Sequence, residues 1–320
     1  MSTFEWQNFF ISPLNSGLIF GLLALGVFIA FRVLDIADLS VEGLFPLVSV
    51  FSCFTILQGW NPALVIVVSV LIGAASGIIN ALLSLYLKIP PLLSGIVMMS
   101  ALFAISIIII HFNGGYVNLS NVDPTVYSWL IGVFKTAGLN TFWSNAVAKI
   151  IIVGVIDTLV VALVYFFFGT EMGMAVRAAG KNKQMARANG ISVNQMTIIG
   201  LAVSSALVAL AATLYCQHTL SATPQDGQGM IVLGLSTLFL GETILPHRSF
   251  KAHLLSVFGG SFIYWYVIQI LFKIMGDGDY FLYLYKALLL VLILAIPHLL
   301  KIAKAKISRR RQETENAPVR

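Results

Sequence analysis

The amino-acid sequence predicts an all-α polytopic membrane protein, and three observations lead to this fold class. Hydrophobic residues make up 58% of the 320-residue chain and charged residues only 10%, whereas globular proteins usually carry about 25% charged residues. Apolar runs of about 17 to 25 residues, long enough to cross a bilayer, recur along nearly the whole length. No stretch between them is long enough to bury a separate soluble core, so a soluble enzyme domain is excluded.

About nine membrane segments are expected. In chain order they cover residues 13–31, 44–57, 62–87, 91–111, 146–168, 197–217, 229–245, 252–272 and 281–300. The second is short for a full crossing and follows the acidic sequence LDIADLSVEG, a combination that is typical of a discontinuous helix lining a cavity. The polar stretch 112–145 is expected to form an external loop with a short helix near 126–134.

The order of the segments suggests an inverted-repeat-like bundle. In each half, a helix is followed by an acidic, glycine-containing segment (35–43 and 224–229) and then a shortish apolar run, as in many transporters. Residues 1–308 would thus form one transmembrane permease domain with a cytoplasmic loop at 169–196, and 309–320 a basic cytoplasmic tail. The spacings Gly17/Gly21 and Gly73/Gly77 predict close helix packing.

Lysine and arginine placement predicts the orientation. Short cytoplasmic loops are enriched in these residues. If the loop 170–196 is inside, alternation places fifteen basic residues inside and four outside. The N-terminus is then expected outside and the C-terminus in the cytoplasm, with the basic tail against membrane lipid.

Several function classes are disfavoured by composition. The net charge of +6 arises from residues in the loops, so orientation explains it better than nucleic-acid binding does. Cys53 and Cys216 are far apart and lack metal-ligand spacing, so they are interpreted as packing residues. No metal site or cofactor is expected.

Six polar residues are candidates for a substrate pathway, because an acid within a membrane needs water or a partner. They are Asp35, Asp38, Ser40, Glu42, Asp157 and Glu242. Two alternatives remain for the first group: a solvated loop paired with Arg32, or a metal-diphosphate site as in membrane prenyltransferases. Asp157 could equally be a protonated hydrogen-bond donor between helices.

The loop 169–196 (GTEMGMAVRAAGKNKQMARANGISVNQM) is the most specific stretch of the chain. A short helix is expected over about 182–188, capped by Asn182, opened by Gly180 and stopped by Gly190. Gly180-Lys181 imitates the end of a phosphate-binding loop, but Ala175 occupies the position of the earlier glycine and Asn182 that of the Ser or Thr. The chain therefore has no ATPase site of its own.

The loop pattern T-x-x-G-x-A-x-R-A-x-G-x-N-x-x-x-A-x-x-x-G-I, which begins at Thr170 and ends at Ile191, resembles the coupling loop of permease subunits in ABC importers of the branched-chain amino acid and ribose type. LDIADLSVEG and LGLSTLFLGE resemble conserved segments of the same permeases. More narrowly, RVLDIADLSVEGLFPL and LGETIL resemble tryptophan/tyrosine transport permeases.

This resemblance implies a transport subunit with several partners: a pair of cytoplasmic ABC ATPases, an extracellular substrate-binding lipoprotein and a second permease copy in a homodimer of the bacterial plasma membrane. It assigns ATPase coupling to nine residues of the loop: Arg177, Ala178, Gly180, Lys181, Asn182, Met185, Ala186, Arg187 and Gly190. The cargo it implies is an amino acid, with tryptophan or tyrosine favoured.

Two rival functions remain open on the sequence. A secondary transporter or channel would work without an ATPase and would use its intramembrane acids for ion coupling. A membrane prenyltransferase-like enzyme would need a second acidic motif, and Asp277 with Asp279 lies on the outside in the expected topology. Neither rival explains the loop pattern.

Overall fold

The computed structural model describes residues 3–112, 117–119, 125–136, 141–244 and 249–275, with positions 284, 287–292 and 295. Its long helices are α1 (Thr3–Phe28), α3 (Pro62–Tyr86), α4 (Pro91–Phe112), α6 (Thr141–Gly169), α9 (Val193–Thr219) and α11 (Phe250–Met275). The shorter ones are α2 (Val41–Leu57), α5 (Ser128–Thr136), α7 (Glu171–Lys181), α8 (Lys183–Ala188) and α10 (Met230–Ile244). A small antiparallel ribbon pairs β1 (Val117–Asn118) with β2 (Ser221–Ala222).

The all-α membrane fold expected from the sequence is confirmed. Seven helical segments in the described part of the chain are long and apolar enough to cross a membrane: Phe9–Val33, Pro62–Tyr86, Pro91–Phe112, Trp143–Gly169, Val193–Thr219, Pro224–Ile244 and Phe250–Lys273. The second of the nine expected segments is the shorter helix α2, and the ninth, 281–300, lies largely outside the described residues. The expected short helix of the external loop is present as α5.

Helices α1 and α9 form the centre of the bundle. In their apolar windows 78% and 72% of residues are buried, against 33%, 28% and 22% in α3, α4 and α6. The latter three therefore form much of the apolar surface that faces outward, toward lipid.

Small residues let the central helices approach one another closely, as their spacing predicted. A Cβ on Gly17 of α1 would lie 2.6 Å from the ring of Phe262 in α11, and Gly21 meets the same helix one turn later. Gly73 and Gly77 of α3 lie in the same way against the backbone of α9. Both predicted contacts are therefore packing features.

Hydroxyl side chains connect α2 to its neighbours. The hydroxyl of Ser52 lies 3.1 Å from that of Ser69 in α3 and 3.1 Å from that of Thr213 in α9. Ser49 donates to the carbonyl of Ala212 at 3.2 Å. Hydrogen bonds of this kind hold a short, discontinuous helix in register within an apolar bundle.

The interpretation of Cys53 and Cys216 as separate packing residues was wrong. The two form a disulfide between α2 and α9, with their Cα atoms 6.3 Å apart. They are 163 positions apart in sequence, and only the packing of α2 on α9 brings them together. Sequence spacing alone carries no signal for such a pair.

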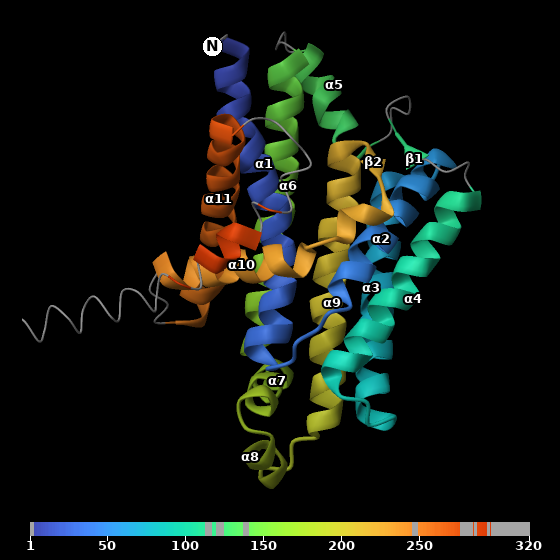
Figure 1. Cartoon of the computed structure of the whole chain (residues 1–320), viewed down its shortest axis with the longest axis vertical. Coiled ribbons are helices and arrows are strands. Elements are labelled where there is room, and N and C mark those ends of the chain that lie inside the picture. The colour runs from blue at the N-terminus through green and yellow to red at the C-terminus, as the bar shows by residue number, and fades with distance from the viewer. Residues whose placement is uncertain are drawn as a thin grey trace, which may run out of the picture.

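The two ends of the bundle differ. The N-terminus, α5 and the β1–β2 ribbon lie at one end, and α7 and α8 project from the opposite end (Figure 1). Helix α10 runs across the bundle at about mid-height and not along it (Figure 1). Its start and the preceding 3-10 turn η2 (Pro224–Gly227) both pack against α2. The two interrupted segments therefore meet inside the molecule, while the inverted-repeat relationship stays a prediction.

Candidate translocation pathway and coupling elements

The acidic segment after α1 is a true break in the helix. Helix α1 widens into a π-helical turn, Ile29–Val33, and the chain then leaves the helix at Asp35, whose φ is 56°. Left-handed backbone is uncommon outside glycine, although aspartate adopts it more readily than most residues. Helical structure resumes only at Val41. The discontinuity expected within LDIADLSVEG is therefore present.

Asp38 is the buried carboxylate of this break. Its side chain is 4% exposed, and one oxygen accepts hydrogen bonds from the backbone N–H of Ser40 and from the side-chain amide of Asn80 in α3, both at 2.9 Å. The other oxygen has no hydrogen-bond partner among the described residues. Asp38 borders a cavity of about 130 Å³ whose walls come from α1, the π-helical turn, the break itself, α2 and α10. Asp38 is thus bound to α3 and is not part of a solvated loop.

The neighbouring polar residues behave differently. Asp35 is exposed, whereas Ser40 is buried and its hydroxyl lacks a partner among the described residues. Within that part of the chain no group of three acidic, histidine or cysteine side chains is arranged to hold a metal ion. The acids of the break therefore do not assemble the site that the metal-diphosphate alternative requires.

Glu42, in the first turn of α2, borders a second cavity of about 280 Å³. The cavity is lined by Glu42, Met99, Ser100, Phe103, Gly227 and Gln228. Gly227 in η2 lies directly against the carbonyl oxygen of Glu42 and the ring of Pro46. Pro46 cannot donate the usual helical hydrogen bond to the carbonyl of Glu42, four residues earlier. The second interrupted segment packs against α2 at this point. The two interrupted segments thus border one cavity beside α4, which has Glu42, Ser100 and Gln228 as its polar side chains.

Glu242, also expected to line the pathway, forms ion pairs at the end of α10. Its carboxylate accepts two hydrogen bonds from Arg32, at 2.8 and 2.9 Å, and lies 2.8 Å from Nε2 of His253. This arrangement ties the end of α10 to the end of α1 and the start of α11. The pairing that the loop alternative assigned to Arg32 and the acids of the break is therefore made with Glu242 instead.

Asp157 stands apart from both cavities. It is 4% exposed within α6, and neither carboxylate oxygen has a hydrogen-bond partner among the described residues. Helix α6 packs on α1, α5, α7 and α11, and neither pathway cavity is lined by Asp157. The structure does not bring it together with Asp38 and Glu42.

The loop at 169–196 folds as two short helices with defined caps. The Asn182 side chain accepts hydrogen bonds from the N–H groups of Gln184 and Met185 at 3.1 and 3.0 Å, which starts α8. Gly190 follows α8 with φ 78°, and the bonds Gly190 N–H to Arg187 and Ile191 N–H to the carbonyl of Ala186 close it as a Schellman motif. The expected cap and stop are confirmed.

Gly180 was expected to open this helix, and that part was wrong. It lies inside the last turn of α7, because the chain forms a separate helix before Asn182. A Cβ on Gly180 would collide with the carbonyl oxygen of Val33 and approach the Cα of Leu34. Glycine is required here for close approach of α7 to the end of α1.

The other loop residues divide between buried and exposed positions. Ala186, expected as a docking contact, is only 2% exposed and packs with Ala179 and Val193, so it joins α7, α8 and α9 to one another. Met185 is 64% exposed, and Arg187 is exposed as well. The remaining expected contacts, Arg177, Ala178 and Lys181, lie along α7.

Sequence reasoning did not single out some residues that contact Asp38 or line the Glu42 cavity. Asn80, which donates to Asp38, lies within the expected segment 62–87, and Met99, Ser100 and Phe103 lie within the expected segment 91–111. Ser100 is exposed on α4, and a serine within an apolar run was the one available signal for this face. Gln228 follows a glycine in the second break, a weak signal in the same direction.

These features define a polytopic helical membrane protein with two interrupted segments, cavities that border the acids Asp38 and Glu42, and a structured loop at one end. Residues 9–297 match the family described as branched-chain amino acid transport system / permease component. The chain belongs to this family, the permease type of ABC importers. The family is one of transport subunits.

The curated relatives of the chain are named for different transported substrates. The chain is 27% identical to a tyrosine transport system permease protein of Clostridioides difficile, over 81% of each chain. It is also 27% identical to the fructose import permease protein FrcC of Rhizobium meliloti, over 81% of this chain and 69% of the relative. A probable branched-chain amino acid permease of Methanocaldococcus jannaschii, LivH, is 26% identical over 63% and 64%. No solved structure matches.

Proposed function

We propose that this chain is the permease of a homodimeric bacterial plasma-membrane importer for an amino acid, with an aromatic amino acid, tyrosine or tryptophan, as the cargo. An extracellular binding protein delivers the cargo and a pair of cytoplasmic ABC ATPases drives its passage. The similarity to the tyrosine permease over four fifths of both chains supports the amino-acid class.

The observation that carries this function is the direct contact between α7 and the helix break. Gly180 of α7 lies against Val33, and the break that contains Asp38 begins two residues later. A movement of α7 and α8 driven by ATPases would be transmitted to the break through this backbone contact, since packed elements move as rigid bodies. Met185 and Arg187 on α8 provide an exposed apolar contact and a charge for the partner.

The Glu42 cavity supports a homodimer with the pathway near its axis. Glu42 is partly exposed, and Ser100 is exposed on the adjoining face of α4. Placing a carboxylate against lipid costs about 2.5 kcal/mol or more on insertion scales. A second copy covering this face would replace lipid with a water-filled path between two Glu42 carboxylates.

Two features support the orientation with α7 and α8 in the cytoplasm. Basic residues concentrate in that loop, as short cytoplasmic loops require. The Cys53–Cys216 disulfide lies near the ends of α2 and α9, on the side of the N-terminus and the β ribbon (Figure 1). Disulfides persist in oxidising compartments, so this end is assigned to the outside.

Reconstitution tests the function. The permease would be co-expressed with a candidate ABC ATPase and binding protein and placed in proteoliposomes, and uptake of tyrosine, tryptophan, leucine and fructose compared with and without ATP. We expect uptake that requires ATP and favours the aromatic amino acids. Uptake driven by an ion gradient without ATP would support the secondary-transporter alternative and overturn the proposal.

Cross-linking tests the dimer separately. Ser100→Cys, on the face beside the Glu42 cavity, should yield a permease dimer with a short thiol cross-linker in membranes. Leu163→Cys, at an exposed position of α6, is the matched control and should remain monomeric. Equal cross-linking at both positions would mean that the α4 face is not the dimer contact.

A further inference from the structure

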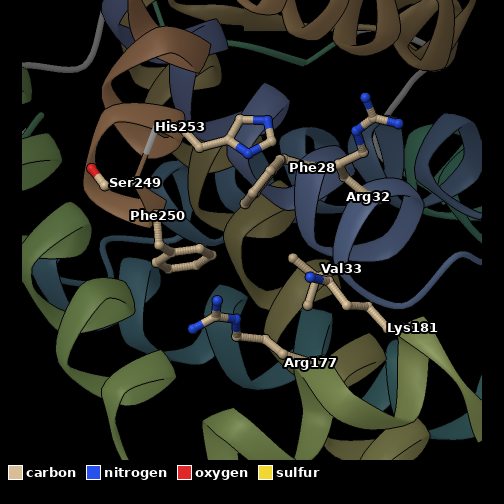
Figure 2. Close-up of a pocket in the computed structure, with 8 residues that line it drawn as sticks. All are labelled: Phe28, Arg32, Val33, Arg177, Lys181, Ser249, Phe250 and His253. Carbon is tan, nitrogen blue, oxygen red and sulfur yellow. The ribbon is translucent and has the colours of Figure 1, made fainter. Parts of the chain in front are cut away.

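A cavity of about 400 Å³ lies where α7 meets the end of α1 and the start of α11. Cavities of this size hold small ligands. Its lining residues, shown in Figure 2, are Phe28, Arg32, Val33, Arg177, Lys181, Ser249, Phe250 and His253. It is separate from the cavities that border Asp38 and Glu42, and two of its lining residues, Arg177 and Lys181, are among those that the family resemblance assigns to ATPase coupling.

Among the described residues, two cations of the cavity lack acidic partners. Arg177 stacks over the ring of Phe250, with its guanidinium carbon 4.6 Å from the ring centre. Stacking occupies the flat face of a guanidinium and leaves its in-plane N–H groups available for hydrogen bonds. The Lys181 side chain extends into the same space, near Val33 (Figure 2). Within the described part of the chain, neither cation forms an ion pair with a carboxylate.

Arg32 differs from these two residues, because Glu242 already neutralises its charge. Glu242 also holds His253 at 2.8 Å. The pair therefore fixes one wall of the cavity and adds no free negative charge to it. No carboxylate of the described residues pairs with Arg177 and Lys181 on the opposite wall.

Apolar groups complete the site. The rings of Phe28 and His253 are in contact, with centroids 4.7 Å apart, and they line the cavity with Phe250. Leu255, two residues after His253 on α11, is 63% exposed. The cavity thus combines an anion-binding wall with an aromatic wall at the boundary between the apolar bundle and the projecting helices α7 and α8.

We propose that this basic cavity binds a phosphate group through Arg177 and Lys181. The arginine fork matches phosphate oxygens in a bidentate manner, and lysine adds a point charge. The phosphate belongs either to an anionic phospholipid of the adjoining leaflet or to a soluble phosphate compound. Basic pockets between helices at the cytoplasmic side are typical sites for lipid head groups. A bound phosphate would join α7 to α1 and α11 and so stabilise the position of the coupling element.

Binding can be measured on the full chain without transport. The purified protein would be exchanged into phosphatidylcholine nanodiscs, and its thermal unfolding followed as phosphatidylglycerol is added to the discs. In a second arm, inorganic phosphate is titrated against chloride at equal ionic strength. Mass spectrometry counts the phosphatidylglycerol retained by each chain.

The test variant is Arg177→Gln with Lys181→Gln, and the matched control is Lys183→Gln with Arg187→Gln, which removes the same charge from α8, outside the cavity. We expect the wild type and the control to be stabilised, and the test variant to bind about tenfold more weakly or worse, because it lacks both charge-assisted contacts. Lys181→Gln alone, at an exposed position, and Arg177→Lys provide milder variants if the double change unfolds the protein.

The outcomes distinguish the two possible sources of the phosphate group and show when the proposed phosphate site is wrong. Stabilisation by phosphatidylglycerol alone identifies a lipid head group, and stabilisation by inorganic phosphate identifies a soluble compound. No stabilisation of the wild type in either arm, or the same stabilisation in the test and control variants, overturns the proposal. These results do not depend on ATP-driven uptake, so the proposed transport function stands or fails separately.

Discussion

Gly180 of α7 packs so closely on the carbonyl oxygen of Val33 that no side chain fits between them. Val33 is the last residue of the π-helical turn that ends α1. The contact therefore joins α7, which precedes the proposed ATPase-binding helix α8, to the start of the segment that carries Asp38.

Adding a methyl group at this contact should uncouple the two elements. We expect Gly180→Ala to lower the free energy of unfolding by about 1–3 kcal/mol, the usual cost of overpacking, and to reduce ATP-driven uptake further than the loss of folded protein explains. Gly154→Ala, at a position with open space around it, is the control. Normal uptake by Gly180→Ala would show that α7 does not act through Val33.

The charge of Asp38 can be separated from its hydrogen bonds. Asp38→Asn retains a carbonyl oxygen that can accept from Ser40 and Asn80, so we expect folding to be nearly unchanged and uptake to fall. Asn80→Ala should instead destabilise the protein by about 1–3 kcal/mol, because a buried acceptor loses a partner. Thermal unfolding and uptake assays check both, and full uptake by Asp38→Asn would remove its carboxylate from the pathway.

The Arg32–Glu242 pair should contribute little to global stability. The Arg32 side chain is 46% exposed, so solvent screens the pair, and we expect Arg32→Gln to cost about 1 kcal/mol or less. A double-mutant cycle with Glu242→Gln, followed by thermal unfolding, measures the coupling. A coupling energy well above this range would mean that the pair is needed to hold the end of α1 against the end of α10.

A charge on α8 should disrupt association with the ATPase. Met185 is 64% exposed, and we expect Met185→Glu to abolish co-purification with the ATPase while membrane insertion stays normal. Thr136→Glu, which adds the same charge at the opposite end of the bundle, should have no effect. Met185 is a cleaner position than Ala186, whose burial means that a bulky substitution would disturb the packing of α7, α8 and α9. Retained co-purification of Met185→Glu would contradict the coupling assignment.

The orientation predicts which positions are accessible from outside. An impermeant thiol reagent applied to intact cells should label Trp129→Cys, which is 76% exposed on α5, and should leave Lys183→Cys unlabelled until the cells are opened. The native cysteines are bonded to each other and give no background. The reverse pattern would invert the topology and with it the assignment of α7 and α8.

Much of the architecture was predictable because its causes are local. Apolar length predicted the long helices, and the acidic run before a short apolar one predicted the break at Asp35. Asn182 and Gly190 predicted the cap and the stop of α8, since each acts on backbone groups within a few residues. The tail from 309 and the segment 281–300 lie outside or largely outside the described residues, so those expectations remain predictions.

Other features depended on which helix faces meet. The sequence by itself determined a polytopic helical bundle, the positions of its breaks and the caps of its projecting loop. Only the tertiary structure decided that Cys53 forms a disulfide with Cys216 and that Asn80 forms a hydrogen bond with Asp38. It also decided that Arg32 pairs with Glu242, not with the acids of the break, and that Ala186 is buried. The two residues of each pair are 42 to 210 positions apart in the sequence. Each apolar helix presents several faces of nearly equal hydrophobicity, so the choice among them rests on close packing of small residues and on satisfying a few polar groups, and neither can be evaluated until all the helices are in place.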